Sequence, residues 1–537
     1  MKKLLAAVLA AGLLAGCSDD APNPAEPAGP ATPGTLRVLA GSELADLQPV
    51  LDEAAKATGI TVKFTFTGTL EGAEQLAAGG VDGKYDAIWF SSNRYLSGIP
   101  DAAKRLGNQV KIMSSPVVLG LSQSKAKQLG WTDKRVGWGD IAEQAGKKAF
   151  SYGMTDPSAS NSGFSALVGV ASALAGAGTA IDAGQIAAVT PRLKEFFGAQ
   201  TLSAGSSGWL SDAYQRRASG QDGGAPVDGL VNYESVLLSL NASGKLPEPL
   251  TLVYPSDGVV TADYPLTLLS SAGQDARDAH QRLSDHLRTP DVQKRIMETT
   301  RRRPVVPGVD LGAQFAVKDL VELPFPTNPQ AVDGLLAAYF DELRRPSRTL
   351  YVLDTSGSMA GDRIDALRTA LVGLTGADGS LTGRFRRFRS REEVTLLPFN
   401  TTPGSPRTFT LPEQNPQPQL DEIKNYAQTL EAGGGTAIYD SLSRAFEVMR
   451  PLVEKDPDRF TSIVLMTDGE NSNGSTFADF RGSYPSRAVK GVPVFTVLFG
   501  EGSSDELTTV ASLSGGKVFD ARSAQLGDVF QEIRGYQ

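Results

Sequence analysis

The sequence predicts an α/β protein made of two different α/β parts, and three observations lead to this prediction. After about residue 347, continuous apolar runs alternate with helical patterns. Between about 35 and 310, shorter strand and helix units alternate with polar turns at the strand ends. Residues 18–34 are rich in proline and alanine and have no apolar period, which is typical of a tether. Alternating strands and helices favour parallel or mainly parallel sheets.

The first 17 residues have the layout of a secretory signal. Two lysines precede an apolar run that ends in small residues and is too short to span a bilayer. The stretch LAGC, residues 14–17, resembles the lipobox of bacterial lipoproteins, and this resemblance implies cleavage before Cys17 and diacylation of its thiol. We therefore expect an extracytoplasmic protein that is lipid-anchored to the bacterial cell membrane. The alternative is an ordinary signal peptide that happens to contain a cysteine.

Composition excludes several classes of function. A formal net charge of -8 and a pI near 5.2 give no whole-chain attraction to nucleic acid. With one cysteine there is no internal disulfide, and two histidines, His280 and His286, are too few for a histidine-built zinc site. The same scarcity leaves no Ser-His-Asp or Cys-His arrangement. We therefore expect a protein that is not an enzyme.

The units between 35 and 310 end in polar turns. TLRVLAGSEL (35–44) reads as a strand entering a Gly-Ser turn, and YDAIWFSSN (85–93) as a strand ending in hydroxyls. SSPVVLGLSQS (114–124) reads as a crossing strand, and residues 150–174 as strand, loop and helix. Polar groups at several strand ends favour a ligand cleft over a solid core.

The loop DPSASNSG, residues 156–163, is the strongest candidate for part of that cleft. Ser160, Asn161 and Ser162 fall where the following helix must begin, so backbone N–H groups and hydroxyls would converge there. Such a helix start favours an anion, although these residues are also explained as simple N-caps. Weaker candidates, each also explained as a turn or packing residue, are Ser91, Ser92, Tyr233 and Glu234.

Residues 35–310 are similar to the type II extracellular solute-binding proteins of bacterial ABC importers. The similarity rests on dispersed stretches: DAIWFSSN (86–93), TDPSASNSGFSAL (155–167), LVNYESVLL (230–238) and YPSDGVVTADYPLTLL (254–269). It implies two α/β lobes that close on a small polar or anionic solute. It also implies that the strands near Ser115 to Leu121 and Val259 to Leu266 cross between the lobes.

The chain from 347 to 537, reached through a connector at 311–346, is predicted to form a doubly wound, mainly parallel sheet. Residues Ile364, Leu367, Leu371 and Leu374 follow helical spacing between two of its strands. Ligands of such sheets bind at the carboxyl ends of the strands. The predicted strands, continuous apolar runs suited to burial on both faces, are TLYVLD (349–354), VTLLPF (394–399), TSIVLMTD (461–468), PVFTVLF (493–499) and GKVFDA (516–521).

Oxygen-bearing side chains follow the ends of these strands. DTSGSM (354–359) supplies Asp354, Ser356 and Ser358, three glycines place Thr436 at a helix start, and Asp468 ends another strand. An all-oxygen set of carboxylates and hydroxyls suits a hard divalent cation. Mg²⁺ fits best because it prefers octahedral oxygen coordination and retains waters, with Mn²⁺ or Ca²⁺ as alternatives.

Asp-x-Ser-x-Ser, a distant Thr after a glycine-rich turn and Asp-Gly after a strand resemble the metal-ion-dependent adhesion site of von Willebrand factor type A domains. The resemblance covers about residues 347–537. It implies that Asp354, Ser356, Ser358 and Thr436 hold the metal directly or through water, and that Asp468 acts mostly through water. It also implies that an acidic side chain of a partner protein supplies the last metal ligand.

Three rival interpretations of these residues are weaker. A plain Ser/Gly turn does not explain Thr436 and Asp468 at matching places. A phosphotransferase of the haloacid dehalogenase type needs a second acid two residues after its nucleophile, and residue 356 is serine. A phosphate-binding loop at GGGTA (433–437) lacks the Lys-Ser or Lys-Thr that a Walker motif requires.

The stretch RFRRFRSREE, residues 384–393, has five arginines interleaved with two phenylalanines. One interpretation is a solvated segment with both rings packed inward, and the other is a contact with anionic lipid or wall polymer.

Two functions are compatible with the whole chain. In the first, the C-terminal domain binds a protein partner through its metal in adhesion or assembly, and the lobes sense or carry a solute. In the second, the lobes deliver solute to an ABC permease and the C-terminal domain only docks. Phosphoryl transfer at Asp354 is a distant third.

Overall fold

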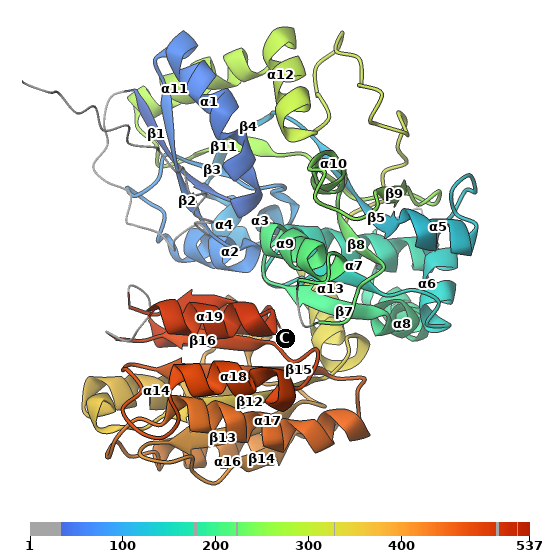
Figure 1. Ribbon diagram of the computed structural model, residues 1–537. Coiled ribbons are helices and arrows are strands. Elements are labelled where there is room, and N and C mark those ends of the chain that lie inside the picture. Colours follow the sequence, from blue (N-terminus) through green and yellow to red (C-terminus); the bar gives the residue numbers. More distant parts are fainter. Residues whose placement is uncertain are drawn as a thin grey trace, which may run out of the picture.

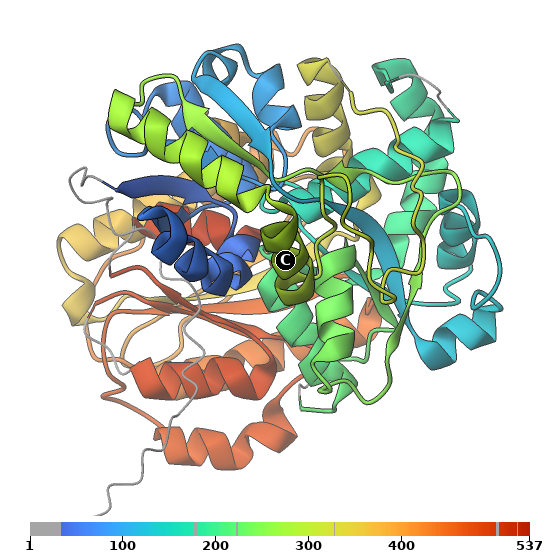
Figure 2. The ribbon, with the colours of Figure 1, turned by 90° about the horizontal axis from the view of Figure 1, so that it is seen from above.

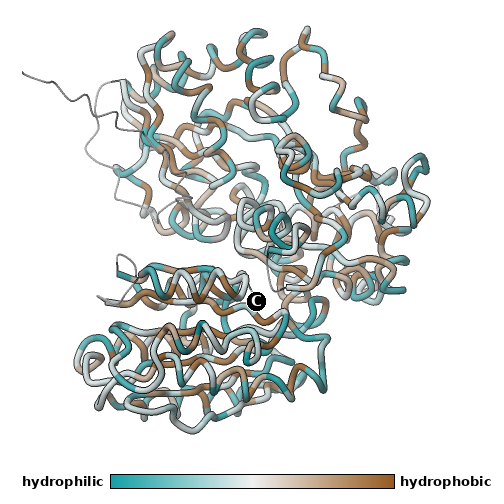
Figure 3. The backbone as a smooth tube through the Cα atoms, viewed as in Figure 1, coloured by the Kyte–Doolittle hydropathy of each residue, from teal (hydrophilic) through white to brown (hydrophobic). Residues whose placement is uncertain are grey.

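The computed structural model describes residues 34–176, 180–221, 224–326, 328–500, 504–522 and 525–536. This part of the chain forms three α/β units, and each unit is a sheet covered by helices (Figure 1). Hydrophobic residues concentrate along the strands and the inner faces of the helices (Figure 3). Cys17 and the rest of the predicted signal and tether lie outside the described residues, so those expectations stay predictions. Within the described ranges, the helices are too short or too polar to cross a membrane.

The first lobe is built on a five-stranded sheet of order β2-β1-β3-β11-β4. Strands β1, β2 and β3 are parallel, and β11 runs antiparallel to β3 and β4. The strands are β1 (Thr35–Ala40), β2 (Thr61–Phe66), β3 (Ala87–Trp89), β4 (Leu106–Lys111) and β11 (Pro265–Leu269). The helices are η1 (Ser42–Leu47), α1 (Gln48–Thr58), α2 (Thr69–Ala78), α3 (Arg94–Gly98), α4 (Pro100–Ala103), α11 (Gln274–Leu287) and α12 (Pro290–Thr300).

The second lobe is built on a six-stranded sheet of order β10-β5-β8-β6-β7, with β9 also paired to β5. The strands are β5 (Ser115–Ser122), β6 (Tyr152–Thr155), β7 (Gln200–Ala204), β8 (Gly229–Tyr233), β9 (Leu250–Val253) and β10 (Thr261–Ala262). The helices are α5 (Gln123–Leu129), α6 (Trp138–Gly146), α7 (Asn161–Ala175), α8 (Ala183–Gly198), α9 (Ser207–Ala218) and α10 (Glu234–Ala242).

The chain crosses between the lobes where the sequence predicts hinge strands. It leaves the first sheet at β4, enters the second at β5, and returns from β10 to β11. At the return crossing, Thr261 pairs with Pro116 in one sheet, and Leu266 pairs with Trp89 in the other. The prediction of two α/β lobes joined by crossing strands is therefore confirmed.

The C-terminal domain is a six-stranded sheet of order β14-β13-β12-β15-β16-β17, parallel except for the edge strand β14. All five predicted strands form. Its strands are β12 (Ser347–Asp354), β13 (Glu393–Phe399), β14 (Arg407–Thr410), β15 (Phe460–Thr467), β16 (Val494–Leu498) and β17 (Val518–Asp520). Its helices are η3 (Gly357–Met359), α14 (Asp362–Val372), η4 (Gly373–Ala377), α15 (Leu381–Arg386), α16 (Gln417–Gln428), α17 (Ile438–Lys455), α18 (Phe477–Arg487), α19 (Ser504–Ser514) and α20 (Leu526–Arg534).

The central strand β12 is buried on both faces, and its alternating side chains enter two cores. Leu350 and Val352 pack with residues of α17, whereas Tyr351 and Leu353 pack with residues of α14 and α20. Burial on both faces explains why this strand reads as a continuous apolar run.

A connector helix joins the lobes to the C-terminal domain. It comprises α13 (Pro329–Ala338) and one continuing turn, η2 (Tyr339–Leu343). Leu336 and Tyr339 are buried in the hydrophobic core shared with both lobes, and the Tyr339 hydroxyl donates to Gln200 Oε1 of β7 at 3.1 Å. The connector therefore packs as an integral part of the core.

The C-terminal domain contacts both lobes, and Figure 2 gives a second view of this arrangement. On the first lobe, the Thr382 hydroxyl donates to Glu74 Oε2 of α2 at 2.6 Å. On the second lobe, the Tyr536 ring packs edge-on against Trp209 of α9, with 4.9 Å between the ring centroids. The domain thus contacts the first lobe through Thr382 and the second lobe through Tyr536, near the end of the described chain.

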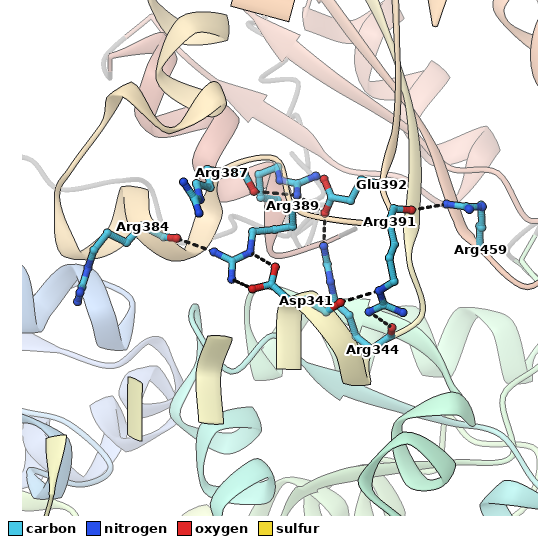
Figure 4. A network of polar contacts seen from close by, with 9 residues as sticks. Asp341, Arg344, Arg384, Arg387, Arg389, Arg391, Glu392 and Arg459 are labelled. Atoms are coloured by element: carbon cyan, nitrogen blue, oxygen red, sulfur yellow. Dashed lines mark hydrogen bonds and ion pairs between the residues drawn. The ribbon is translucent and has the colours of Figure 1, made fainter. Parts of the chain in front are cut away.

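Figure 4 shows that the arginine-rich stretch faces the connector. Arg389 forms two hydrogen bonds to the Asp341 carboxylate, at 2.9 and 2.6 Å, and Arg391 donates to the Asp341 carbonyl at 2.6 Å. Beside them, the buried carboxylate of Glu392 accepts from Arg344 and Arg534. The prediction that both phenylalanines, Phe385 and Phe388, pack inward is confirmed. The segment itself is not the solvated one that this interpretation assumed, because Arg386 and Arg389 are buried as well.

Candidate functional site

The carboxyl end of β12 places Asp354 at the edge of the C-terminal sheet. Its carboxylate is fully buried and accepts two hydrogen bonds, from the Ser356 N–H at 2.8 Å and from the Thr467 hydroxyl at 2.6 Å. Thr467 ends the neighbouring strand β15, so both strand ends hold this one side chain. Asp354 is therefore fixed in position before any ligand binds.

A chain of hydroxyls connects this strand end to Asp468. The Ser358 hydroxyl donates to Asp468 Oδ1 at 2.7 Å, and the hydroxyl oxygens of Ser356 and Ser358 lie 3.0 Å apart. Since Ser358 gives its proton to Asp468, Ser356 is the donor between the two serines. The structure thus brings four of the five predicted metal ligands into direct contact.

The fifth, Thr436, lies on the glycine-rich loop that packs against the same turn. The Gly357 N–H donates to the Gly434 carbonyl at 2.9 Å, and the Gly433 N–H donates to the Thr355 carbonyl at 2.8 Å. Gly434 has φ +84°, and a Cβ there would lie 2.7 Å from the Thr401 hydroxyl. A side chain at this position would thus be strained and crowded, which explains the glycine.

Electrostatics at this edge favour a cation. Burial raises the pKa of Asp354, and the nearby charge of Asp468 raises it further. Arg363 of α14 pairs with Asp468 Oδ2 at 2.5 Å, and its side chain is 41% exposed. A half-exposed guanidinium therefore compensates one carboxylate, while the other is buried with only neutral donors.

The residues fit a hard divalent cation. Two carboxylates and three hydroxyls give an all-oxygen donor set, which suits Mg²⁺. In the described ranges, there is no group of three or more His, Cys, Asp and Glu side chains placed to hold a metal.

Some of the predicted solute residues also come together, at the junction of the two lobes. The Tyr233 hydroxyl donates to Ser91 Oγ at 2.9 Å and accepts from Asn161 Nδ2 at 3.1 Å. The α7 helix begins at Asn161 as expected, and Ser160 Oγ lies 3.2 Å from Ser162 Oγ. One helix-start N–H, that of Gly163, is already bound to the Thr155 hydroxyl at 2.8 Å.

Two of the weaker candidates serve local structure. Glu234 is buried and forms an ion pair with Arg303 at 2.6 Å, and it also accepts from the Tyr254 hydroxyl. The Ser92 hydroxyl accepts from the Arg94 N–H at the start of α3. Both contacts satisfy these side chains within the protein.

Two polar residues that the sequence analysis missed join this cluster. Ser207 Oγ lies 2.8 Å from Ser162 Oγ and donates to Asn232 Oδ1 at 3.2 Å. Asn232 lies at the end of β8, and Ser207 begins α9. The signal that could have found Ser207 is SSG at 206–208 after a strand, which repeats the pattern of the 160–163 loop.

Two family models match the chain, one in its N-terminal part and one in its C-terminal part. The family model of bacterial extracellular solute-binding proteins matches residues 36–299. The von Willebrand factor type A domain model matches residues 350–532. These ranges coincide with the two lobes and with the C-terminal sheet.

Among curated proteins, inter-alpha-trypsin inhibitor heavy chain H4 of Sus scrofa is 31% identical over 134 residues, which is 24% of this chain and 13% of that protein. Heavy chain H3 of Homo sapiens is 27% identical over 199 residues, 35% of this chain and 21% of that protein. The present chain thus spans about a fifth or less of the length of these relatives.

Two solved structures are similar to parts of this chain. A periplasmic binding protein from Actinobacillus pleuropneumoniae, with fructose-6-phosphate bound, has a TM-score of 0.46 and 11% identity, covering 58% of this chain and 99% of that one. A von Willebrand factor type A structure from Catenulispora acidiphila has a TM-score of 0.28 and 20% identity, covering 36% of this chain and 42% of that one. On the family matches and the sheet topology, the chain joins a periplasmic-binding-protein-like region to a von Willebrand factor type A domain.

Proposed function

We propose that this protein is an extracytoplasmic binding protein whose C-terminal domain holds Mg²⁺ and, through it, an acidic side chain of another protein. The contact of Asp354, Ser356, Ser358 and Asp468 at one sheet edge carries this proposal. Asp354 supplies the buried negative charge, Ser356 and Ser358 supply neutral oxygens, and Thr436 lies on the adjoining loop. A divalent cation held by these residues would supply the positive charge that attracts a carboxylate.

The two-lobed region supports a second part of the proposal, binding of a small polar or anionic solute. The family match over residues 36–299 supports this part. The role of the whole chain is then binding without catalysis. The second candidate is a solute receptor of an ABC importer that uses the C-terminal domain for docking, and genes for a permease and an ATPase beside this one would favour it.

Metal-dependent capture tests the main proposal. The full chain, immobilised and exposed to cell-envelope proteins, is expected to retain a partner in Mg²⁺, to release it with a chelator and to rebind it when Mg²⁺ returns. The physical reason is that the partner carboxylate has no cation to bind when the metal is removed. Retained proteins that are the same with and without chelator would contradict the proposal.

We also propose that Cys17 carries a lipid anchor, on the strength of the LAGC stretch. Cys17→Ser removes the thiol that would be acylated, so the variant is expected in the soluble fraction or as unprocessed precursor. Cell fractionation and labelling with a fatty acid measure this, with Ser18→Ala as the control that stays at the membrane. Fatty-acid label on the Cys17→Ser protein would refute the anchor.

A further inference from the structure

Arg363 occupies a position that is unfavourable for an arginine in its own helix. It is the second residue of α14, which begins at Asp362, so its charge lies at the positive end of the helix dipole. The first turn of a helix favours acids, and Asp362 and Asp365 fill that role here. The stability of the helix therefore does not explain an arginine at this position, and its contact with another part of the fold has to be considered.

That contact is with Asp468, one of the predicted metal ligands. Arg363 Nη1 lies 2.5 Å from Asp468 Oδ2, and the Asp468 side chain is 0% exposed. The Ser358 hydroxyl donates to the other carboxylate oxygen, Oδ1, at 2.7 Å. Both oxygens of Asp468 are therefore engaged. Among the described residues, Arg363 is the only charged side chain that pairs with a predicted metal ligand.

The guanidinium of Arg363 uses only part of its hydrogen-bonding capacity. Nη1 donates to Asp468 Oδ2 and, at 3.4 Å, to the Ser358 carbonyl. An arginine carries further N–H donors on Nη2 and Nε, and in the described part of the chain these have no acceptor. The side chain is 41% exposed, and neither nitrogen is a buried atom without a partner. These donors are therefore open to a molecule that approaches the sheet edge.

The charges at this edge show what Arg363 changes. Asp354 and Asp468 contribute two negative charges when ionised, and Arg363 reduces the sum to one negative charge. A bound Mg²⁺ then leaves one positive charge, which a single partner carboxylate neutralises. Without Arg363, the edge with Mg²⁺ would be neutral. It would hold the cation more tightly and attract a carboxylate less.

We propose that Arg363 is a specificity-determining residue of this edge, which lowers the affinity for the divalent cation and raises the affinity for an acidic partner. Its charge opposes that of a cation that depends on Asp468, and its open N–H donors form a charge-assisted hydrogen bond to the partner carboxylate. The inference rests on the proposed function, because it needs both the metal site and the acidic partner. It adds that the partner acid is recognised by this protein's own guanidinium as well as by the metal.

Isothermal titration of the full chain with Mg²⁺ tests the first effect. Arg363→Ala should bind Mg²⁺ about tenfold more tightly than the wild type at low salt, and high salt should shrink this ratio because the guanidinium is half-exposed. Without Mg²⁺ the variant should melt at a lower temperature, because buried Asp468 loses its charge partner. Saturating Mg²⁺ should then raise its melting temperature by more than that of the wild type. A merely structural role would lower the melting temperature without raising the Mg²⁺ affinity.

A peptide of three glutamates tests the second effect, with a peptide of three glutamines as the neutral probe. Binding is measured as the difference between titrations in saturating Mg²⁺ and in chelator. Arg363→Ala should bind the glutamate peptide about tenfold more weakly than the wild type, because a hydrogen bond between charged groups is lost. Arg363→Lys keeps the charge without the planar fork, so its Mg²⁺ affinity should stay near that of the wild type and its peptide affinity should lie between the two.

Arg444→Ala is the matched control. Arg444 is 46% exposed, lies in the same domain and pairs with Glu447, so its loss should change neither affinity. If the wild type binds Mg²⁺ but Arg363→Ala binds it no more tightly, or binds the glutamate peptide equally well, this inference is overturned and the metal site stands. A wild type that binds no Mg²⁺ would overturn the proposed function and this inference together. If Arg363→Ala does not fold, Arg363→Gln gives the same comparison.

Discussion

Asp354→Ala should abolish most of the Mg²⁺ affinity of the protein. Asp354 brings a full charge to a site otherwise built largely of hydroxyls, and it is held by hydrogen bonds from two strand ends. Removal of an outer-shell partner of a metal typically lowers the metal affinity roughly 10- to 100-fold. Loss of Asp354 should lower the Mg²⁺ affinity by more than that. The sheet should stay folded, because the two orphaned donors cost about 1–3 kcal/mol each while a buried carboxylate is also removed. Isothermal titration of the full chain with Mg²⁺ measures the effect.

The matched control is Asp362→Ala, which removes an exposed acid at the start of α14 on the same side of the sheet. Its Mg²⁺ heats should equal those of the wild type. Loss of Ser356, Ser358 or Thr436 one at a time should weaken binding less, because each removes only a neutral oxygen. Equal heats for wild type and Asp354→Ala would mean that DTSGSM is only a turn.

Glu392→Gln should destabilise the folded protein by about 3–5 kcal/mol, because breaking a buried ion pair leaves uncompensated charge in the interior. Glu392 is 1% exposed, and it accepts from the buried guanidiniums of Arg344 and Arg534. Burial alone would raise the pKa of Glu392, but the charges of Arg534 and Arg344 outweigh burial and lower the pKa. Denaturant unfolding of the full chain at neutral pH measures the loss.

The lowered pKa of Glu392 also determines how the stability of the fold depends on pH. A carboxyl whose folded pKa lies below its unfolded value stabilises the fold fully above that unfolded value, about 4.3 for glutamate. The contribution is lost as pH falls through the folded pKa. Wild type should therefore lose stability in acid more steeply than Glu392→Gln, which lacks the contribution at every pH. Glu413→Gln, at an exposed position, is the control. Parallel acid profiles for wild type and Glu392→Gln would rule out this account.

The parts of the fold that were predictable are those with local signals. Strands β12 and β15 are buried on both faces, so each appears in the sequence as a continuous apolar run. The ends of these runs could therefore be predicted, and with them the positions of Asp354 and Asp468. Strand β14 was not predicted, because only Phe409 of its four residues is buried and an edge strand carries little pattern. Thr467 was likewise missed as a partner of Asp354, although it directly precedes Asp468.

Contacts between residues that are far apart in the chain could not be predicted from the sequence. The arginines of 384–391 read as a basic patch, because their counter-charge on Asp341 lies almost 50 residues earlier in the chain. Ser207 and Asn232 join Ser162 only through folding of the second lobe.

The bridging position of the C-terminal domain has a consequence for how the two halves communicate. The domain is attached to the first lobe through Thr382 and Glu74, and to the second through Tyr536 and Trp209. A change in the angle between the lobes would have to strain or break one of these attachments. Any solute that favours one lobe angle therefore alters the free energy of domain docking. If a partner binds the docked and undocked domain with different affinities, the solute changes the affinity for that partner, and by reciprocity the partner changes the solute affinity by the same factor.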